Sequence, residues 1–187
     1  MFSLFIDTTQ SYCNLAILKD KNIITKRSIK TNNNLTDIVI EHIDTLIQKS
    51  KLTHNDINQI FVVIGPGSFT GVRVGVLIAK TWTLIHKTPI YTINSLLFQL
   101  KNGTGLSILD ARGELFYVAA YKNYKCILKP QIITNDKATT LIKKYKTNVF
   151  IGFKNINVFD NLISNLTKFK YTKDINKLSP LYIKNPV

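Results

Sequence analysis

The segment GPGSFTGVRVG, residues 65–75, constrains the fold more than any other part of the chain. It joins an apolar run at 60–64 to an amphipathic run at 72–85. Proline lacks the amide donor that a sheet requires, and glycine admits positive φ, so a strand must end at the Gly-Pro-Gly. Ser68 is a suitable N-cap for the helix that follows. The sequence therefore predicts a corner between a strand and a helix.

Two interpretations of this corner differ in function. A glycine-rich loop that opens a helix can bind phosphate on its free amides. Alternatively, Gly71, Gly75 and Ala79 lie four residues apart and form a flat stripe against which another helix packs. Glycine within a helix costs about 0.5–1 kcal/mol relative to alanine, so the pair calls for a packing reason. Because the P-loop lysine and the G-x-G-x-x-G pattern are both missing, we favour helix packing.

The chain carries a formal net charge of +14, which would usually indicate a nucleic-acid or other anionic partner. The lysines are scattered, however, and are densest at 143–146 and 168–173. We interpret each group as a solvated face, while the charge permits association with RNA. Arginine is rare, and Arg73 and Arg112 both lie in motif-like segments. The planar guanidinium of arginine can form two parallel hydrogen bonds to one partner group, so these two residues are candidates for specific pairing.

Cysteine and histidine usage limits the chemistry. Cys13 and Cys126 are far apart and form no C-x-x-C, which favours a reduced, cytoplasmic setting. His42, His54 and His86 form no zinc-binding motif, so we expect no metal site and no zinc hydrolase. No long apolar segment or signal peptide is visible, and we expect no association with a membrane.

Apolar periodicity predicts strands followed by helices, twice over. A polar break at 31–34 precedes the first helix, and 101–105 is the best linker, which divides the chain into lobes 1–101 and 102–187. The first lobe is predicted to contain strands at 2–6, 13–18, 23–29, 60–64 and 90–93 and helices at 35–49, 68–85 and 95–100. The second is predicted to contain strands at 106–109, 115–121, 125–133 and 149–151 and helices at 136–145 and 157–166. This order predicts a two-lobed α/β arrangement with mixed sheets.

An aspartate ends the first strand of each lobe, Asp7 in one and Asp110 in the other, as part of a weak internal repeat. Aspartates in these positions are typical of the actin-like, sugar-kinase and Hsp70 superfamily, in which the turns that follow cradle phosphates. The turn of Thr8 and Thr9 suits that chemistry, whereas Arg112 is bulky where a phosphate turn requires a small residue. The simpler interpretation is that both aspartates satisfy amides of their own turns. A vestigial nucleotide site is the alternative.

Four segments resemble the TsaB (YeaZ) family: IDTT at 6–9, GPGSFTGVRVG at 65–75, DARGELFYVAAY at 110–121 and PLYIK at 180–184. Members of that family are the dimerisation subunit of the bacterial machinery that makes threonylcarbamoyladenosine in tRNA. The resemblance implies an actin-like (ASKHA, ribonuclease H-like) two-lobed fold, no cofactor and no catalytic activity. The chain differs from the family in lacking a histidine early in the first helix and in being shorter between Gly152 and Pro180, so we expect a shortened second lobe.

The resemblance also implies partners. The transferase chemistry would belong to a longer TsaD-like paralogue, which would pack its helix pair against helices 35–47 and 68–85 of this chain as a four-helix bundle. A TsaE-like ATPase and tRNA would join the complex, and the lone chain could form a homodimer. The alternative is a nucleotide-binding, kinase-type enzyme that uses Asp7 and Asp110. The predicted partner-binding residues are Leu35, Ile38, Val39, His42, Ser68, Gly71, Val72, Arg73, Gly75, Val76 and Ala79.

Overall fold

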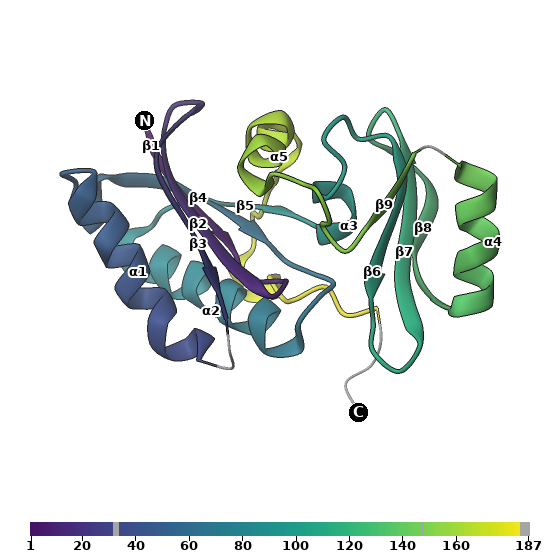
Figure 1. Ribbon diagram of the computed structural model, residues 1–187. Coiled ribbons are helices and arrows are strands. Elements are labelled where there is room, and N and C mark those ends of the chain that lie inside the picture. The colour runs from purple at the N-terminus through teal and green to yellow at the C-terminus, as the bar shows by residue number, and fades with distance from the viewer. Residues whose placement is uncertain (32–33, 147, 184–187) are drawn as a thin grey trace. The chain divides into compact units, whose positions relative to one another are not determined.

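The computed structural model describes residues 1–31, 34–146 and 148–183, which form two compact units (Figure 1). Of the described residues, the first unit comprises those in 1–64, 68–93 and 168–180, and the second comprises those in 65–67, 94–167 and 181–183. The chain therefore leaves the first unit before residue 94 and later returns to it. The predicted division at 101/102 differs from this, because it assigned 94–101 to the first lobe and 168–180 to the second.

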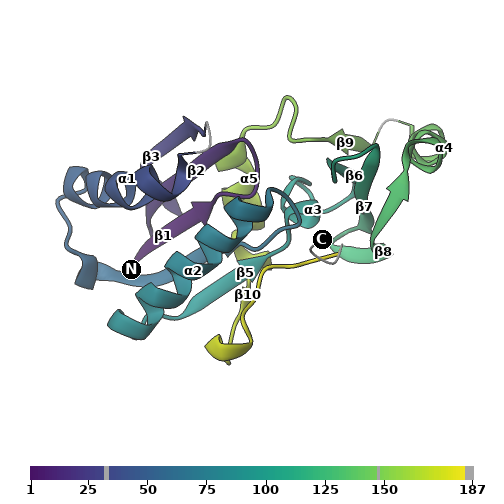
Figure 2. The same cartoon turned by 90° about the horizontal axis from the view of Figure 1, so that it is seen from below.

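The first unit is built on a mixed six-stranded sheet of order β10-β5-β4-β1-β2-β3. Its strands are β1 (Phe2–Asp7), β2 (Tyr12–Lys19), β3 (Asn22–Lys30), β4 (Ile57–Val63), β5 (Ile90–Ile93) and β10 (Lys170–Tyr171). The first three strands form an antiparallel meander, whereas β4 runs parallel to β1 and β5 runs parallel to β4. The two-residue β10 adds an antiparallel edge to β5, as Figure 2 shows.

Two helices cover one face of this sheet, α1 (Leu35–Lys49) and α2 (Phe69–His86) (Figures 1 and 2). Side chains alternate between the faces of a strand, so Leu4 and Ile6 of β1 point to the helices while Phe5 points to the other face. The buried residues Val39 and Ile43 of α1 and Val76 of α2 pack against that apolar face. A short 3₁₀ turn, His54–Asp56, leads from α1 into β4.

The second unit repeats the same order of elements around a four-stranded sheet, β8-β7-β6-β9. Its strands are β6 (Gly105–Asp110), β7 (Leu115–Lys122), β8 (Lys125–Thr134) and β9 (Val149–Ile151), and its helices are α3 (Ser95–Phe98), α4 (Asn135–Tyr145) and α5 (Val158–Asn165). As in the first unit, an antiparallel meander is followed by a helix and a strand parallel to the first. The weak repeat in the sequence is thus a repeat in the structure.

The predicted strands and helices are all present, with bounds that shift by a few residues. The exceptions are elements that were not predicted: β10 and the 3₁₀ turns at Leu166–Lys168 and Ile175–Lys177. Asn32 and Asn33 of the predicted polar break, and Lys184 of the PLYIK segment, lie outside the described residues. In the part of the chain that the structure describes, no helix is long and apolar enough to cross a membrane.

Candidate functional site

The corner at residues 65–75 opens α2 as predicted. The Ser68 side chain caps the helix by accepting a hydrogen bond of 3.3 Å from the Gly71 amide. The Ser68 amide in turn donates to the carbonyl oxygen of Thr9, 2.7 Å away. The N-terminus of α2 is therefore held against the turn that follows β1.

The glycine stripe of α2 faces this same turn. A Cβ atom on Gly71 would lie 1.9 Å from the carbonyl oxygen of Thr8, and one on Gly75 would lie 2.5 Å from the Thr8 hydroxyl. That hydroxyl donates a 2.6 Å hydrogen bond to the Gly71 carbonyl. The structure thus corrects the prediction that the stripe receives a helix from another protein. Close packing on glycine is present, but its partner is Thr8 in the chain's own turn after β1.

The structure divides the other predicted partner-binding residues into three groups. Five of them are buried in the core beneath the helices: Leu35, Val39, Val72, Val76 and Ala79. Ile38, His42 and Ser68 are half-buried. Arg73 alone is exposed, and its guanidinium carbon lies 3.8 Å from the centroid of the Phe69 ring. In this structure the buried residues support the helices and do not present a surface to a partner.

The apolar surface that α2 does expose lies on its opposite side. Leu77, Leu84 and Ile85 are 64%, 67% and 67% exposed, and Val74 and Ile78 beside them are half-buried. These five residues share one side of the helix at 3.6 residues per turn, and we call them the α2 outer face. The prediction missed them because it followed only the stripe that contains glycine. The sequence did contain a signal, because residues 69–86 are apolar on both sides of the helix. Only one side can pack against the sheet of the same unit, so the other side is expected to contact something else.

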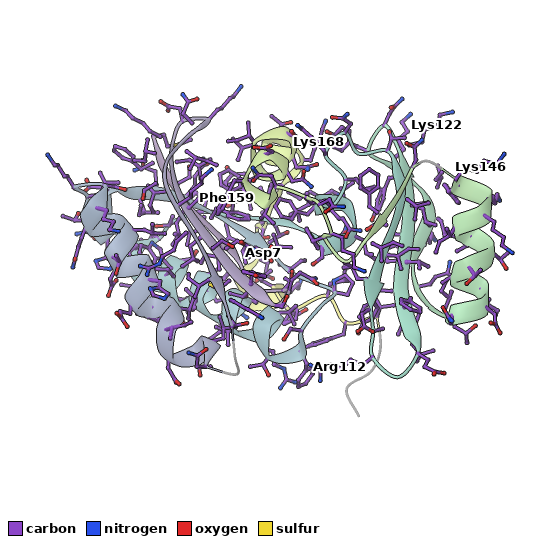
Figure 3. All side chains as sticks on the ribbon, in the orientation of Figure 1. Asp7, Arg112, Lys122, Lys146, Phe159 and Lys168 are labelled. Atoms are coloured by element: carbon purple, nitrogen blue, oxygen red, sulfur yellow. The ribbon has the colours of Figure 1, made fainter. Side chains whose placement is uncertain are left out.

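The carboxylate of Asp7 at the end of β1 is buried and serves its own turn (Figure 3). One oxygen accepts hydrogen bonds from the amide of Thr9 at 3.0 Å and from its hydroxyl at 2.7 Å. Burial raises the pKa of Asp7, and the hydrogen bonds of Thr9 and Asn14 offset part of that rise. Asn14 is the residue that opposes Asp7 on β2.

Asp110 of the second unit has the matching role at the end of β6. Its side chain accepts a 2.7 Å hydrogen bond from the amide of Arg112. Arg112 and Glu114 have φ of 62° and 61°, in the left-handed region that non-glycine residues seldom adopt. The interpretation that both aspartates satisfy amides of their own turns is therefore confirmed. Among the described residues, no group of three acidic, histidine or cysteine side chains is placed to hold a metal ion.

The repeated order of elements defines a protein with an actin-like fold of two related units. Solved structures agree with this class. A Pseudomonas aeruginosa protein described as similar to the peptidase YeaZ superposes with a TM-score of 0.77 at 13% identity, covering 98% of this chain and 99% of that one. YeaZ from the same organism superposes with a TM-score of 0.73, covering 97% and 99%.

Sequence comparison narrows the class to a family. The family model "TsaD: tRNA N6-adenosine threonylcarbamoyltransferase" matches residues 28–161. The tRNA threonylcarbamoyladenosine biosynthesis protein TsaB of Bacillus subtilis is 30% identical over 163 residues, 81% of this chain and 71% of that protein. An uncharacterised Mycoplasma pneumoniae protein is 31% identical over 194 residues, 100% of this chain and 96% of its own length. The chain belongs to the TsaB family of tRNA threonylcarbamoyladenosine biosynthesis proteins.

Proposed function

We propose that this chain is a non-catalytic, cytoplasmic subunit that forms a heterodimer with a TsaD-like paralogue. In that complex it supports threonylcarbamoyl transfer to the tRNA adenosine next to the anticodon. A TsaE-like ATPase and tRNA would be its further partners. The observation that carries the proposal is the α2 outer face, on which three large apolar side chains, Leu77, Leu84 and Ile85, are each about two-thirds exposed.

The α2 outer face suits a helical partner for two reasons. Removing apolar surface from water contributes roughly 25 cal/mol per Å², so a partner that covers these side chains gains free energy. The helix beneath them is also held rigidly, because Gly71 and Gly75 seat it directly on Thr8. A preorganised apolar ridge of this kind fits into the groove of another helix at little entropic cost. Without the paralogue, the same ridge could pair with a second copy of the chain.

The acidic residues support a role without catalysis. Asp7 and Asp110 each bond to an amide of their own turn. Arg112 follows Asp110 in a strained left-handed conformation, where a phosphate-binding turn would be expected to have a small residue. The kinase-type alternative predicts that the lone chain binds ATP and Mg²⁺ tightly, whereas our proposal predicts no tight binding. Calorimetry would distinguish the two.

The test is to place a charge on the α2 outer face. Leu77→Glu should abolish co-elution with the TsaD-like paralogue in size-exclusion chromatography, while the circular dichroism of the lone chain stays unchanged because Leu77 is exposed. Ile127→Glu is the matched control, since Ile127 on β8 of the second unit is 56% exposed. Equal co-elution of Leu77→Glu and the unaltered chain would overturn the proposal, as would equal loss in the control.

A further inference from the structure

An aromatic row crosses the sheet of the first unit on the face opposite α1 and α2. In register, Phe5 of β1 opposes Phe61 of β4, which opposes Tyr91 of β5, which opposes Tyr171 of β10. Ring centroids lie 5.4 Å apart for Phe61 and Tyr91 and 5.6 Å apart for Tyr91 and Tyr171. Phe169 packs edge-on against Phe61 at 5.0 Å. The row therefore leads from the core to the edge of the sheet.

Exposure rises along this row. Phe5 is fully buried and Phe61 is 5% exposed, whereas Tyr171 is 60% exposed. No other aromatic side chain among the described residues is as exposed as Tyr171. Because Tyr91 supports it from the neighbouring strand, Tyr171 offers its ring to solvent on a rigid base. A tyrosine needs few rotatable bonds to be fixed, so such a ring is a low-entropy binding surface.

Lysines flank Tyr171 in the sequence. Lys170 and Lys173 are both exposed, and the segment 168–173 contains three lysines and no acidic residue. The nearest acidic residue in sequence, Asp174, forms an ion pair with Lys177 at 3.5 Å. We call Lys170, Tyr171 and Lys173 the Tyr171 patch.

We infer that the Tyr171 patch binds single-stranded RNA, with a base stacked on Tyr171 and the adjoining phosphates paired with Lys170 and Lys173. Unpaired bases are recognised by stacking on aromatic side chains, and lysines neutralise the backbone beside them. Lysine alone would not carry this inference, because α4 is also lysine-rich (Figure 3). On α4, however, Tyr145 packs against the core of the second unit and offers no free ring. The inference rests on the proposed function only in taking tRNA as the natural ligand.

The test measures fluorescence anisotropy of a labelled single-stranded RNA, its duplex, and tRNA with the isolated full chain at several salt concentrations. We expect tighter binding to the single strand than to the duplex. Tyr171→Ala should weaken binding about tenfold, because stacking contributes roughly 1–3 kcal/mol per base, while Tyr171→Phe should bind normally. Lys170→Gln with Lys173→Gln should reduce the slope of log affinity against log salt by about 1.4, since each phosphate contact on a single strand contributes about 0.7.

The matched control is Lys143→Gln with Lys144→Gln, which removes the same charge from exposed positions on α4. If the control weakens RNA binding as much as the patch variant, net charge alone explains binding and the inference fails. It also fails if Tyr171→Ala binds like the unaltered chain, or if the patch binds vesicles of acidic phospholipid and not RNA. Because the isolated chain is used, these outcomes are independent of whether the TsaD-like paralogue binds the α2 outer face.

Discussion

The hydroxyl of Thr8 lies 2.6 Å from the carbonyl oxygen of Gly71 and donates a hydrogen bond to it. This bond joins the residue after β1 to the first turn of α2, which is 63 residues further along the chain. Only a helix without side chains at residues 71 and 75 can approach the strand so closely. The glycine motif thus fixes the position of α2 against the turn after β1. The opposite side of α2 is the surface that we propose for docking.

The two glycines should respond differently to the removal of Thr8's hydroxyl. Gly75→Ala places its Cβ against that hydroxyl and should destabilise the chain by about 1–3 kcal/mol through overpacking. In a Thr8→Ala background the obstacle is gone, and the same change should be neutral or stabilising by up to about 1 kcal/mol, since alanine is the better helix former. Urea unfolding of the single and double variants measures this coupling.

Gly71→Ala is the internal control, because its Cβ would meet backbone atoms of Thr8. It should cost about 3 kcal/mol in either background, as overpacking against an atom that cannot rotate away. If Thr8→Ala rescued both glycine variants equally, or neither, the geometry described above would be wrong.

Asp7→Asn should change the pH dependence of stability in a defined direction. Because the folded pKa of Asp7 is raised above its ordinary 3.8, the buried group favours its protonated form. Its contribution to stability is fully present below pH 3.8 and is lost as pH rises through the folded pKa. The unaltered chain should therefore lose stability relative to Asp7→Asn between acidic and neutral pH, as followed by urea unfolding at each pH.

Asp20→Asn provides a control of opposite sign. The hydrogen bond of Asp20 with the N-terminal ammonium, and then the attraction of that charge, lower the pKa of Asp20. Its contribution is present above the ordinary pKa and is lost as pH falls. The unaltered chain should thus gain stability relative to Asp20→Asn as pH rises. The same sign for both aspartates would contradict the burial of Asp7.

Gln99 should be a sensitive position in the second unit. Its side chain is fully buried, and it donates to the Ser107 hydroxyl and to the Phe150 carbonyl, both at 2.8 Å, while accepting from the Phe153 amide at 2.7 Å. Gln99→Met keeps a similar side-chain shape but removes the partner of the buried Ser107 hydroxyl and of the half-buried Phe150 carbonyl and Phe153 amide, which should cost about 2–4 kcal/mol in denaturant unfolding. Gln131→Met, at an exposed glutamine on β8, should change stability by less than about 0.5 kcal/mol.

Much of the fold could be predicted because its signals are local. Apolar runs and turn residues mark the strands, and Ser68 marks the start of α2, where its side chain indeed caps the helix. The repeat of an aspartate after the first strand also corresponds to a structural repeat, because each aspartate bonds to its own turn.

The remaining features depend on contacts between distant segments. The spacing of Gly71 and Gly75 shows that something approaches α2 closely, but it does not distinguish Thr8 of the same chain from a partner's helix. The α2 outer face was missed for the same reason, since Leu77 and Val76 look alike in the sequence. β10 has only two residues and no periodicity, and it is a strand only because β5 pairs with it.

The path of the chain determines when each unit can be completed during synthesis on the ribosome. Residues 168–180 complete the first unit, yet they are made after nearly all of the second. Until Lys170 and Tyr171 emerge, the outer edge of β5 has no strand beside it. Such an edge can pair with other chains, so the nascent first unit is open to mispairing for as long as translation of the second unit takes. Slow translation of residues 94–167 would therefore lengthen the period in which this protein is prone to aggregate.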